Sequence, residues 1–255
     1  MKNTNSFIST TIITFNEERN IERCLKSLLP VSDEIIIIDS FSTDKTLEIC
    51  ARYGAKIFQH KFEGYGSQKQ FASSQATYNH ILSIDADEEL SPQLISSILA
   101  IKDNWTHDSY SFNRRNYYCN KPIRFCGWYP DRQVRLYNRL KTGWNDNQVH
   151  EFIAPTDKHV VKHINGDLNH FTCNSIIEHQ YKEEKYARLN ADILINKKKR
   201  VLFFTPYLKG TFRFFKTYIL KLGLLDGYYG WMISKTLAKS SFYKYYWAYK
   251  THTKI

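Results

Sequence analysis

The sequence predicts an α/β protein in which a mostly parallel sheet carries helices on both faces. Three observations lead to this fold class. Strand-like and helix-like segments alternate four times over residues 8–104, four consecutive isoleucines occupy 35–38, and polar clusters follow three of the strands. An unbroken apolar strand is typical of a parallel sheet covered on both faces. A repeated strand–helix order favours parallel pairing with right-handed crossovers.

The first two strand–helix units are predicted from residue type and spacing. Residues 8–15 are β-branched and aromatic, which favours a strand. The apolar positions of 16–30 fall at helical spacing, and a proline ends that helix. The isoleucine strand follows. A helix over 43–55 then begins at a threonine or aspartate that can cap it and ends at a glycine.

The second half of the series repeats this order and then changes character. We expect a strand, a helix, a strand and a helix over 56–62, 66–78, 80–87 and 91–104. Residues 109–175 are rich in aromatic residues and arginine, with strand-like segments at 109–118 and 132–138. The stretch "KHINGDLNHF" predicts two strands joined by a turn at Asn-Gly-Asp.

Composition and short motifs exclude several classes of protein. There is no GxGxxG and no GxxxxGK[ST], so a dinucleotide site and a P-loop are unsupported. No secretory leader is expected, and no stretch of about 18 apolar residues predicts a spanning helix. Five cysteines without a CxxC pair argue against a zinc site and favour free thiols in a reducing cytoplasm.

Two aspartates after the fourth strand, Asp85 and Asp87, are candidate metal ligands. They are two residues apart, so in an extended segment both point to the same side. Two carboxylates suit Mg²⁺ or Mn²⁺, which in turn can hold a diphosphate. A solvated acidic loop or a set of helix caps would have the same sequence. The spacing alone leaves these alternatives open.

The motifs together resemble the family 2 glycosyltransferases, whose nucleotide-sugar-binding fold is called GT-A. "TTIITFNEERNIERCLKSL", "EIIIIDSFSTDKTLEIC", "GYGSQKQFA" and "ILSIDADEEL" follow one another in the order and spacing of that family. "GWYPDRQVRLYNR", "QVHEF" and "LGLLDGYYG" resemble bacterial enzymes that add a sugar, often glucose, to the lipopolysaccharide inner core. The resemblance implies an inverting hexosyltransferase that uses a nucleotide-sugar donor, usually UDP-linked, and a divalent cation, Mg²⁺ or Mn²⁺.

Most candidate donor-site residues are implied by this resemblance. Asp39 matches the aspartate that hydrogen-bonds the base, and Lys69 could pair with Asp39 or with the nucleotide. The sequence departs from the family in having Asp39-Ser40-Phe41 and Lys69-Gln70 at positions where other members often have Asp-Asp-Gly and Arg-Asn. The full predicted nucleotide-binding set is Thr14, Asn16, Glu17, Asp39, Lys69, Asp85 and Ala86.

The remaining candidates concern the metal, the acceptor and the base. Asp87 is the expected metal ligand, and His170 matches a histidine that approaches the metal or diphosphate, although a structural histidine would look the same. Gln133 and Arg135 would share one strand face and contact the acceptor or diphosphate, or else form a strand-edge salt bridge. Glu151 matches the catalytic-base position, with Asp146 as an alternative.

The C-terminal segment is strongly basic. Residues 197–255 hold 13 Lys and Arg and one acid, Asp226, so this segment carries +12 while the first 196 residues carry −1. Leu208, Phe212, Phe215, Ile219 and Leu222 form one apolar helical stripe. Aromatic and basic residues beside such a stripe favour an anionic membrane surface, although a helical hairpin packed on the body has the same pattern. No motif for nucleic acid is present.

These observations predict three parts and one function. Residues 1–108 form a nucleotide-sugar-binding half, 109–196 an acceptor and catalytic half, and 197–255 a helical membrane-association segment. The enzyme would transfer a sugar to a lipid-linked glycan at the cytoplasmic face of the inner membrane. The alternatives are a sugar nucleotidyltransferase, which would need a glycine-rich phosphate loop in place of the acidic "TFNEERN", and a non-catalytic membrane-binding scaffold.

Overall fold

A computed structural model describes residues 7–144, 153–155 and 161–252 of the chain. The chain divides into two compact units. Unit 1 comprises Met1–Arg114 and Asp131–His170, and unit 2 comprises Arg115–Pro130 and Phe171–Ile255. The predicted boundaries at 108/109 and 196/197 remain predictions, because these units divide the chain at other positions.

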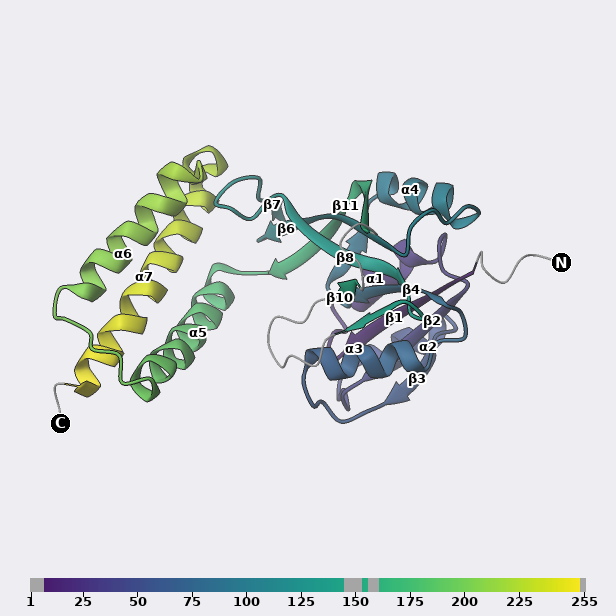
Figure 1. Ribbon diagram of the computed structural model, residues 1–255, viewed down its shortest axis with the longest axis horizontal. Helices are drawn as coiled ribbons and strands as arrows, with labels where there is room; N and C mark the ends of the chain where they lie inside the picture. Colours follow the sequence, from purple (N-terminus) through teal and green to yellow (C-terminus); the bar gives the residue numbers. More distant parts are fainter. Residues whose placement is uncertain (1–6, 145–152, 156–160, 253–255) are drawn as a thin grey trace. The chain divides into compact units, whose positions relative to one another are not determined.

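Unit 1 is built on a sheet whose first four strands are parallel (Figure 1). Their spatial order is β3, β2, β1 and β4, with parallel pairing between each pair of neighbours. The bounds of these strands in that order are Lys56–Gln59, Glu34–Asp39, Ile8–Thr14 and His80–Asp85. The predicted α/β fold class is confirmed, and the four strands correspond to the four that the sequence predicts.

The second half of the sheet is largely antiparallel. β8 pairs antiparallel with both β4 and β6, and β11 pairs antiparallel with β5. The short strand β7 pairs with the end of β6, and β9 and β10 form a separate two-stranded sheet. The bounds of β5 to β11 are Glu88–Leu90, Ser109–Tyr118, Lys121–Pro122, Asp131–Asn138, Thr142–Trp144, Ile153–Pro155 and Val161–Cys173.

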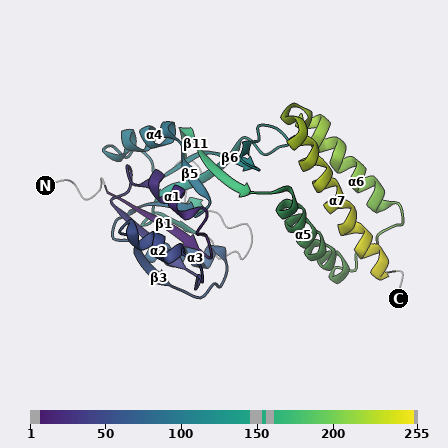
Figure 2. The same ribbon diagram turned by 180° about the vertical axis from the view of Figure 1, so that it is seen from behind.

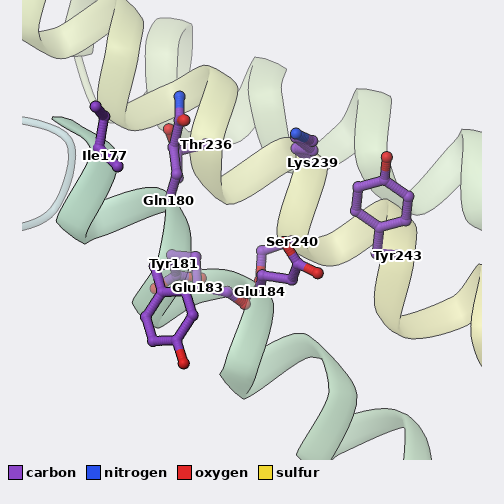
Figure 3. Close-up of a pocket in the computed structure, with 9 residues that line it drawn as sticks. All are labelled: Ile177, Gln180, Tyr181, Glu183, Glu184, Thr236, Lys239, Ser240 and Tyr243. Carbon is purple, nitrogen blue, oxygen red and sulfur yellow. Dashed lines mark hydrogen bonds between the residues drawn. The ribbon is translucent and has the colours of Figure 1, made fainter.

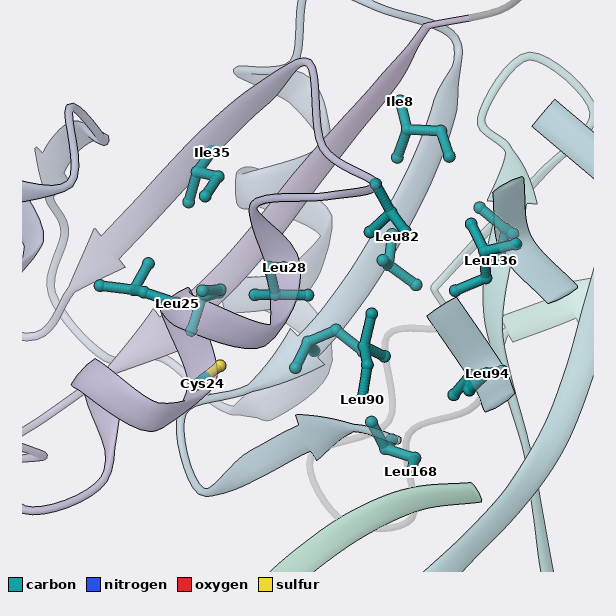
Figure 4. Packing of buried hydrophobic residues seen from close by; sticks show 14 of the residues in the cluster. Ile8, Cys24, Leu25, Leu28, Ile35, Leu82, Leu90, Leu94, Leu136 and Leu168 are labelled. Atoms are coloured by element: carbon teal, nitrogen blue, oxygen red, sulfur yellow. The ribbon is translucent and has the colours of Figure 1, made fainter. Parts of the chain in front are cut away.

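Helices cover both faces of the parallel strands. The isoleucine strand alternates between two cores: Ile35 and Ile37 belong to one cluster, and Ile36 and Ile38 to the other. The first cluster includes side chains of α1 (Ile21–Leu28), α2 (Thr46–Arg52) and α4 (Pro92–Lys102). Figure 4 shows those of α1 and α4, such as Leu25 and Leu94, beside the strands. The second cluster includes α3 (Tyr65–Ser74). Because both faces of this strand are buried, each of its four isoleucine positions takes an apolar side chain.

The predicted strand pair in "KHINGDLNHF" is wrong. One strand, β11, runs through the whole stretch from Val161 to Cys173. Gly166 has a φ of 107°, and a Cβ at this position would lie 2.4 Å from the backbone nitrogen of Leu94. The glycine therefore permits close approach to the start of α4 and does not form a hairpin turn.

Unit 2 consists mainly of three long helices, α5 (Ile176–Asn196), α6 (Thr205–Phe215) and α7 (Gly227–His252). α7 packs against both α5 and α6 (Figures 1 and 2). A π turn over Lys216–Leu220 and a 3-10 turn over Gly223–Asp226 join α6 to α7. Among the helices that the structure describes, none combines the length and the apolar character needed to cross a bilayer.

Candidate active site

The polar clusters after β1, β2 and β4 lie at adjacent strand ends. They are Asn16-Glu17, Asp39-Ser40 and Asp85-Ala86-Asp87. The register places Thr14 opposite Asp39 and Ile13 opposite Asp85, so the carboxyl ends of β1, β2 and β4 are neighbours. In open α/β sheets, ligands bind outside the carboxyl ends of the strands. The strand register therefore brings these clusters together at one edge of the sheet.

Asp39 is fully buried and organises the loop after β2. Its carboxylate accepts hydrogen bonds from the hydroxyl of Thr14 at 3.0 Å and from the backbone N–H of Ser42 at 2.8 Å. The Ser42 hydroxyl donates a further hydrogen bond to it. Thr14 and Ser42 therefore hold the Asp39 carboxylate in place.

Asn16 and Glu17 form the loop after β1. Asn16 has a φ of 55°, a left-handed conformation that asparagine tolerates better than most residues. Its side-chain oxygen accepts from the N–H of Thr43 at 2.8 Å, and the N–H of Glu17 donates to the Thr46 hydroxyl at 2.8 Å. Both contacts tie the β1 loop to the β2 loop, and the Asn16 side chain remains exposed.

Asp85 stands between two cations at the end of β4. Its two carboxylate oxygens contact Lys69 Nζ of α3 at 2.8 Å and Arg135 Nη2 of β8 at 2.7 Å. Burial alone would raise the pKa of Asp85, but the charges of Arg135 and Lys69 hold it well below its usual range. Lys69 also lies 4.7 Å from the ring centre of Trp144. Asp85 is therefore a fixed, permanently ionised carboxylate.

Glu88 is a buried member of this cluster, and the sequence did not single it out. Glu88 begins the short strand β5 and has no exposed surface. Its carboxylate contacts Arg135 Nη2 at 2.9 Å and accepts the N–H of Asp85 at 2.9 Å. Burial and the charge of Asp85 raise the pKa of Glu88, and Arg135 opposes this shift.

The cluster continues along β6 and β8. Arg114 lies 3.7 Å from Glu88 and donates to Asp131 at 2.7 and 2.8 Å, and Gln133 donates to Asp131 at 2.7 Å. We call this set of side chains the charged network: Lys69, Asp85, Glu88, Arg114, Asp131, Gln133 and Arg135. Its three cations and three carboxylates cancel at their ordinary charges, which is the condition for burying ions without a large penalty.

A β-bulge places Arg135 in the network. Ser111 pairs with Val134 and Tyr110 pairs with Leu136, so Arg135 is an extra residue with no counterpart on β6. A bulge re-aims the side chains beside it. That Gln133 and Arg135 share one face of the strand stays a prediction. With only 3% of its surface exposed, Arg135 is placed to position Asp85 and Glu88.

Asp87 and His170 form the predicted metal pair. Their closest atoms, Asp87 Oδ2 and His170 Nε2, are 3.3 Å apart, and both side chains are partly exposed. β11 brings the histidine here, because His170 lies opposite Glu88 in the β5–β11 register. Among the described residues, no group of three or more His, Cys, Asp and Glu could hold a metal on its own. One carboxylate and one imidazole fit a cation that takes its other ligands from substrate phosphates and water.

The candidate base Glu151 and its alternative Asp146 lie outside the described residues. Unit 2 has a shallow groove of about 230 Å³ between α5 and α7, lined by residues such as Tyr181, Glu184 and Lys239 (Figure 3). This groove contains none of the predicted site residues.

Comparison with known proteins identifies the family. The sequence profile of the family "Glycosyl transferase family 2" matches residues 9–157. An uncharacterised glycosyltransferase of Rickettsia typhi is 30% identical over 249 residues, covering 92% of this chain and 84% of that protein. The lipopolysaccharide core biosynthesis glycosyltransferase LpsC of Rhizobium meliloti is 32% identical over 235 residues, covering 85% and 84%. The chain therefore belongs to glycosyl transferase family 2 and is a glycosyltransferase, as the motifs predict.

Solved structures also align with this chain, at low sequence identity. Staphylococcus aureus TarS, residues 1–349, aligns with 97% of this chain and 91% of its own at 14% identity and a TM-score of 0.47. Glucosyl-3-phosphoglycerate synthase of Mycobacterium tuberculosis, with Mn²⁺ and UDP, aligns with 44% of each chain at 22% identity and a TM-score of 0.36. The predicted GT-A fold class is confirmed by the family and by the α/β architecture described above.

Proposed function

We propose that this enzyme transfers a hexose, with inversion, from a UDP-sugar to a lipid-linked glycan of the lipopolysaccharide core type. The observation that carries the proposal is the position of Asp85 and Asp87 at the carboxyl end of β4, beside the ends of β1 and β2. The name of the LpsC relative supports the acceptor class. The UDP bound to the mycobacterial enzyme is the usual nucleotide of the family that the motifs resemble.

The nucleotide would bind across the ends of β1, β2 and β4. Asp39, held in place by Thr14 and Ser42, would accept a hydrogen bond from the base. Asp85 would accept one from the ribose, since the charges of Lys69 and Arg135 keep it ionised. Asn16, Glu17 and Ala86 would line this edge. Arg135, although predicted to contact the acceptor or diphosphate, is proposed to act through Asp85, because it is buried against two carboxylates.

Asp87 and His170 would hold the divalent cation, Mg²⁺ or Mn²⁺, together with the donor's diphosphate. When bound, such an ion offsets the charge that develops on the leaving diphosphate. The charged network is neutral on its own, so the Asp87 carboxylate beside His170 adds a negative charge that attracts a cation. Gln133, half-buried beside Asp131, remains a candidate contact for the acceptor or diphosphate.

Transfer also requires removal of the acceptor's proton as its hydroxyl attacks the sugar. We propose Glu151 as the base, on the resemblance of "VHE" to the family's motif. We further propose that the enzyme works at the cytoplasmic face of the inner membrane, where a lipid-linked acceptor would be found. The concentration of 13 basic residues in 197–255 supports this location.

Isothermal titration of UDP in Mn²⁺ or in EDTA tests the donor site, and release of UDP from UDP-glucose and related donors tests the chemistry. We expect UDP to bind much more tightly with Mn²⁺ than in EDTA. We expect Asp87→Asn to lose on the order of 10²–10³-fold in turnover, as when one group that stabilises transition-state charge is removed. Asp103→Asn, on an exposed aspartate after α4, is the matched control.

Three results would contradict this proposal. Metal-independent UDP binding, or full turnover by Asp87→Asn, would remove the metal role from Asp87. Glu151→Gln transferring at the parent rate would exclude Glu151 as the base. Vesicle binding with no affinity for UDP would leave the non-catalytic scaffold as the better description.

A further inference from the structure

Unit 2 exposes most of the large apolar side chains that lie on the described surface. Fourteen of the 26 exposed large hydrophobic residues fall between Leu202 and Trp231, in and around α6 and the turn that follows it. Scattered exposed apolar residues are ordinary, but a contiguous group marks an interaction surface. The arrangement of these residues indicates which partner they fit.

α6 has an inner and an outer side. Its inner side is lined by Pro206 and Gly210, which are buried, and a Cβ on Gly210 would lie 3.2 Å from Phe242 of α7. The opposite side carries what we call the outer stripe: Leu208, Phe212, Phe215 and Ile219, which are 40–60% exposed. α7 packs against both α5 and α6 (Figure 2), and among the described residues the outer stripe stays exposed on the side of α6 opposite Gly210.

A row of cations runs beside the outer stripe. Lys209, Arg213 and Lys216 are exposed, and at helical spacing they fall on one flank of it. The one acidic residue of 197–255, Asp226, accepts hydrogen bonds from the N–H groups of Arg124 and Phe125 at 3.1 and 2.9 Å. That carboxylate is therefore used inside unit 2, and it does not neutralise the basic row.

The turn after α6 extends the apolar surface. Leu220, Leu222, Leu224, Leu225 and Tyr228 are all more than 40% exposed. We call these five residues the hairpin tip. Leucine and aromatic side chains on one side, with lysine and arginine beside them, are the composition of helices that lie in the interface of an anionic bilayer.

We propose that the outer stripe, the basic row and the hairpin tip form one surface that docks on an anionic lipid bilayer, with α6 lying in the headgroup region. This assigns particular residues to the membrane location on which the proposed function rests. A second copy of the chain is the less favoured partner, because pairing through this surface would bring two basic rows together with no acidic residue opposite them.

Co-sedimentation of the full chain with vesicles tests this surface. The probes are vesicles of phosphatidylcholine alone and of phosphatidylcholine mixed equally with phosphatidylglycerol. We expect binding to the anionic vesicles that weakens in high salt, since each basic residue near such a surface adds roughly fivefold to the partition coefficient. Leu208→Ser/Phe212→Ser should lower that coefficient by at least about tenfold, because two apolar side chains no longer enter the interface.

The matched control is Leu29→Ser/Phe62→Ser in unit 1, which removes a leucine and a phenylalanine that are 50% and 47% exposed. It should bind vesicles like the parent. Equal binding by the Leu208/Phe212 variant would overturn the proposal. A dimer that this variant abolishes, without vesicle binding by the parent, would also overturn it in favour of a second copy.

Hydrolysis of UDP-glucose without lipid separates this inference from the proposed function. The Leu208/Phe212 variant should hydrolyse the donor like the parent, because its substitutions lie in unit 2 and outside the donor site. Loss of vesicle binding with donor hydrolysis intact supports the docking surface. Vesicle binding by a parent chain that neither binds UDP nor hydrolyses the donor would refute the proposed function and leave the docking surface standing.

Discussion

The two units of this glycosyltransferase treat charge and apolar surface in opposite ways. Unit 1 buries ions: Lys69, Arg135 and Glu88 have at most 3% of their surface exposed, and each has an oppositely charged partner. Unit 2 leaves cations and apolar side chains together on its surface, as at Arg213 and Phe212. Buried ions fix the geometry of a small site, whereas exposed apolar residues indicate a partner that is not part of the chain.

The largest effect is expected from breaking the charged network of unit 1. Arg135→Gln leaves the buried carboxylate of Glu88 and the partly buried one of Asp85 without their shared cation. Removing one partner of a buried ion pair destabilises a protein by about 3–5 kcal/mol. Chemical denaturation should show that loss, while Arg132→Gln, on an exposed arginine of the same strand, should stay within about 0.5 kcal/mol.

A second substitution distinguishes a positioning role from simple packing. Glu88→Gln in the Arg135→Gln background removes one of the two carboxylate charges that have lost their cation, so it should recover part of the lost stability. If Arg135 acts through Asp85, UDP affinity should remain low in that double variant after stability improves. Recovery of both together would mean that Arg135 only supports the fold.

Acid should affect the two units over different pH ranges, beginning with unit 2. Burial and the nearby charge of Lys182 lower the pKa of His179 from 6.5 to about 4. The folded state binds this proton less readily than the unfolded state, so its stabilising contribution is full above pH 6.5 and is lost as the pH falls toward 4. At pH 5 the loss is about 2 kcal/mol.

Hydrogen exchange along α5 at pH 7 and pH 5 measures this effect. We expect faster exchange at pH 5 around His179, which lies 3.2 Å from the hydroxyl of Tyr118. His179→Gln should flatten that pH dependence. Exchange near His179 that is unchanged between the two pH values would contradict the prediction.

The sequence predicts those parts of the fold that depend on patterns within short segments of the chain. Residue type and helical spacing, together with the four isoleucines, predicted the first seven elements in order and then α4, but not the short strand β5 between β4 and α4. β6 matches the predicted 109–118. The prediction of a turn at Asn-Gly-Asp was wrong because the glycine that favours a hairpin turn also allows another backbone segment to approach closely. The backbone of Leu94, which makes Gly166 necessary, is far away in the sequence.

The site was predictable as a set of strand ends but not as a network. Asp39, Asp85 and Asp87 stand out because they follow apolar runs, and the parallel order of the strands brings those strand ends together. The role of Glu88 was not predicted, because its burial depends on Arg135 and the position of Arg135 depends on a bulge. Register shifts and buried partners arise from tertiary packing, so no local spacing reports them.

A smaller acid effect is expected in unit 1, at lower pH than in unit 2. Glu34 would have a raised pKa from burial alone, but hydrogen bonds from Lys56, Ser9 and Thr77 hold it at about 2, below the ordinary 4.5. This contribution is present above pH 4.5 and is lost as the pH falls from 4.5 toward 2. Glu34→Gln should therefore weaken the dependence of stability on pH between 4.5 and 2. A denaturation midpoint that depends equally on pH in both proteins would contradict this.

The smallest effect on stability is expected where the apolar surface is largest. Leu208→Ala shortens a side chain that is 60% exposed, so the unfolded and folded states lose similar contact with water and ΔG of unfolding should change by less than about 0.5 kcal/mol. Leu82→Ala, in the fully buried core of unit 1, should lose about 2–5 kcal/mol. Urea denaturation of both variants measures the contrast. A loss above about 2 kcal/mol for Leu208→Ala would mean that this side chain packs within the protein, and the outer stripe would then be part of a core and unavailable to a membrane.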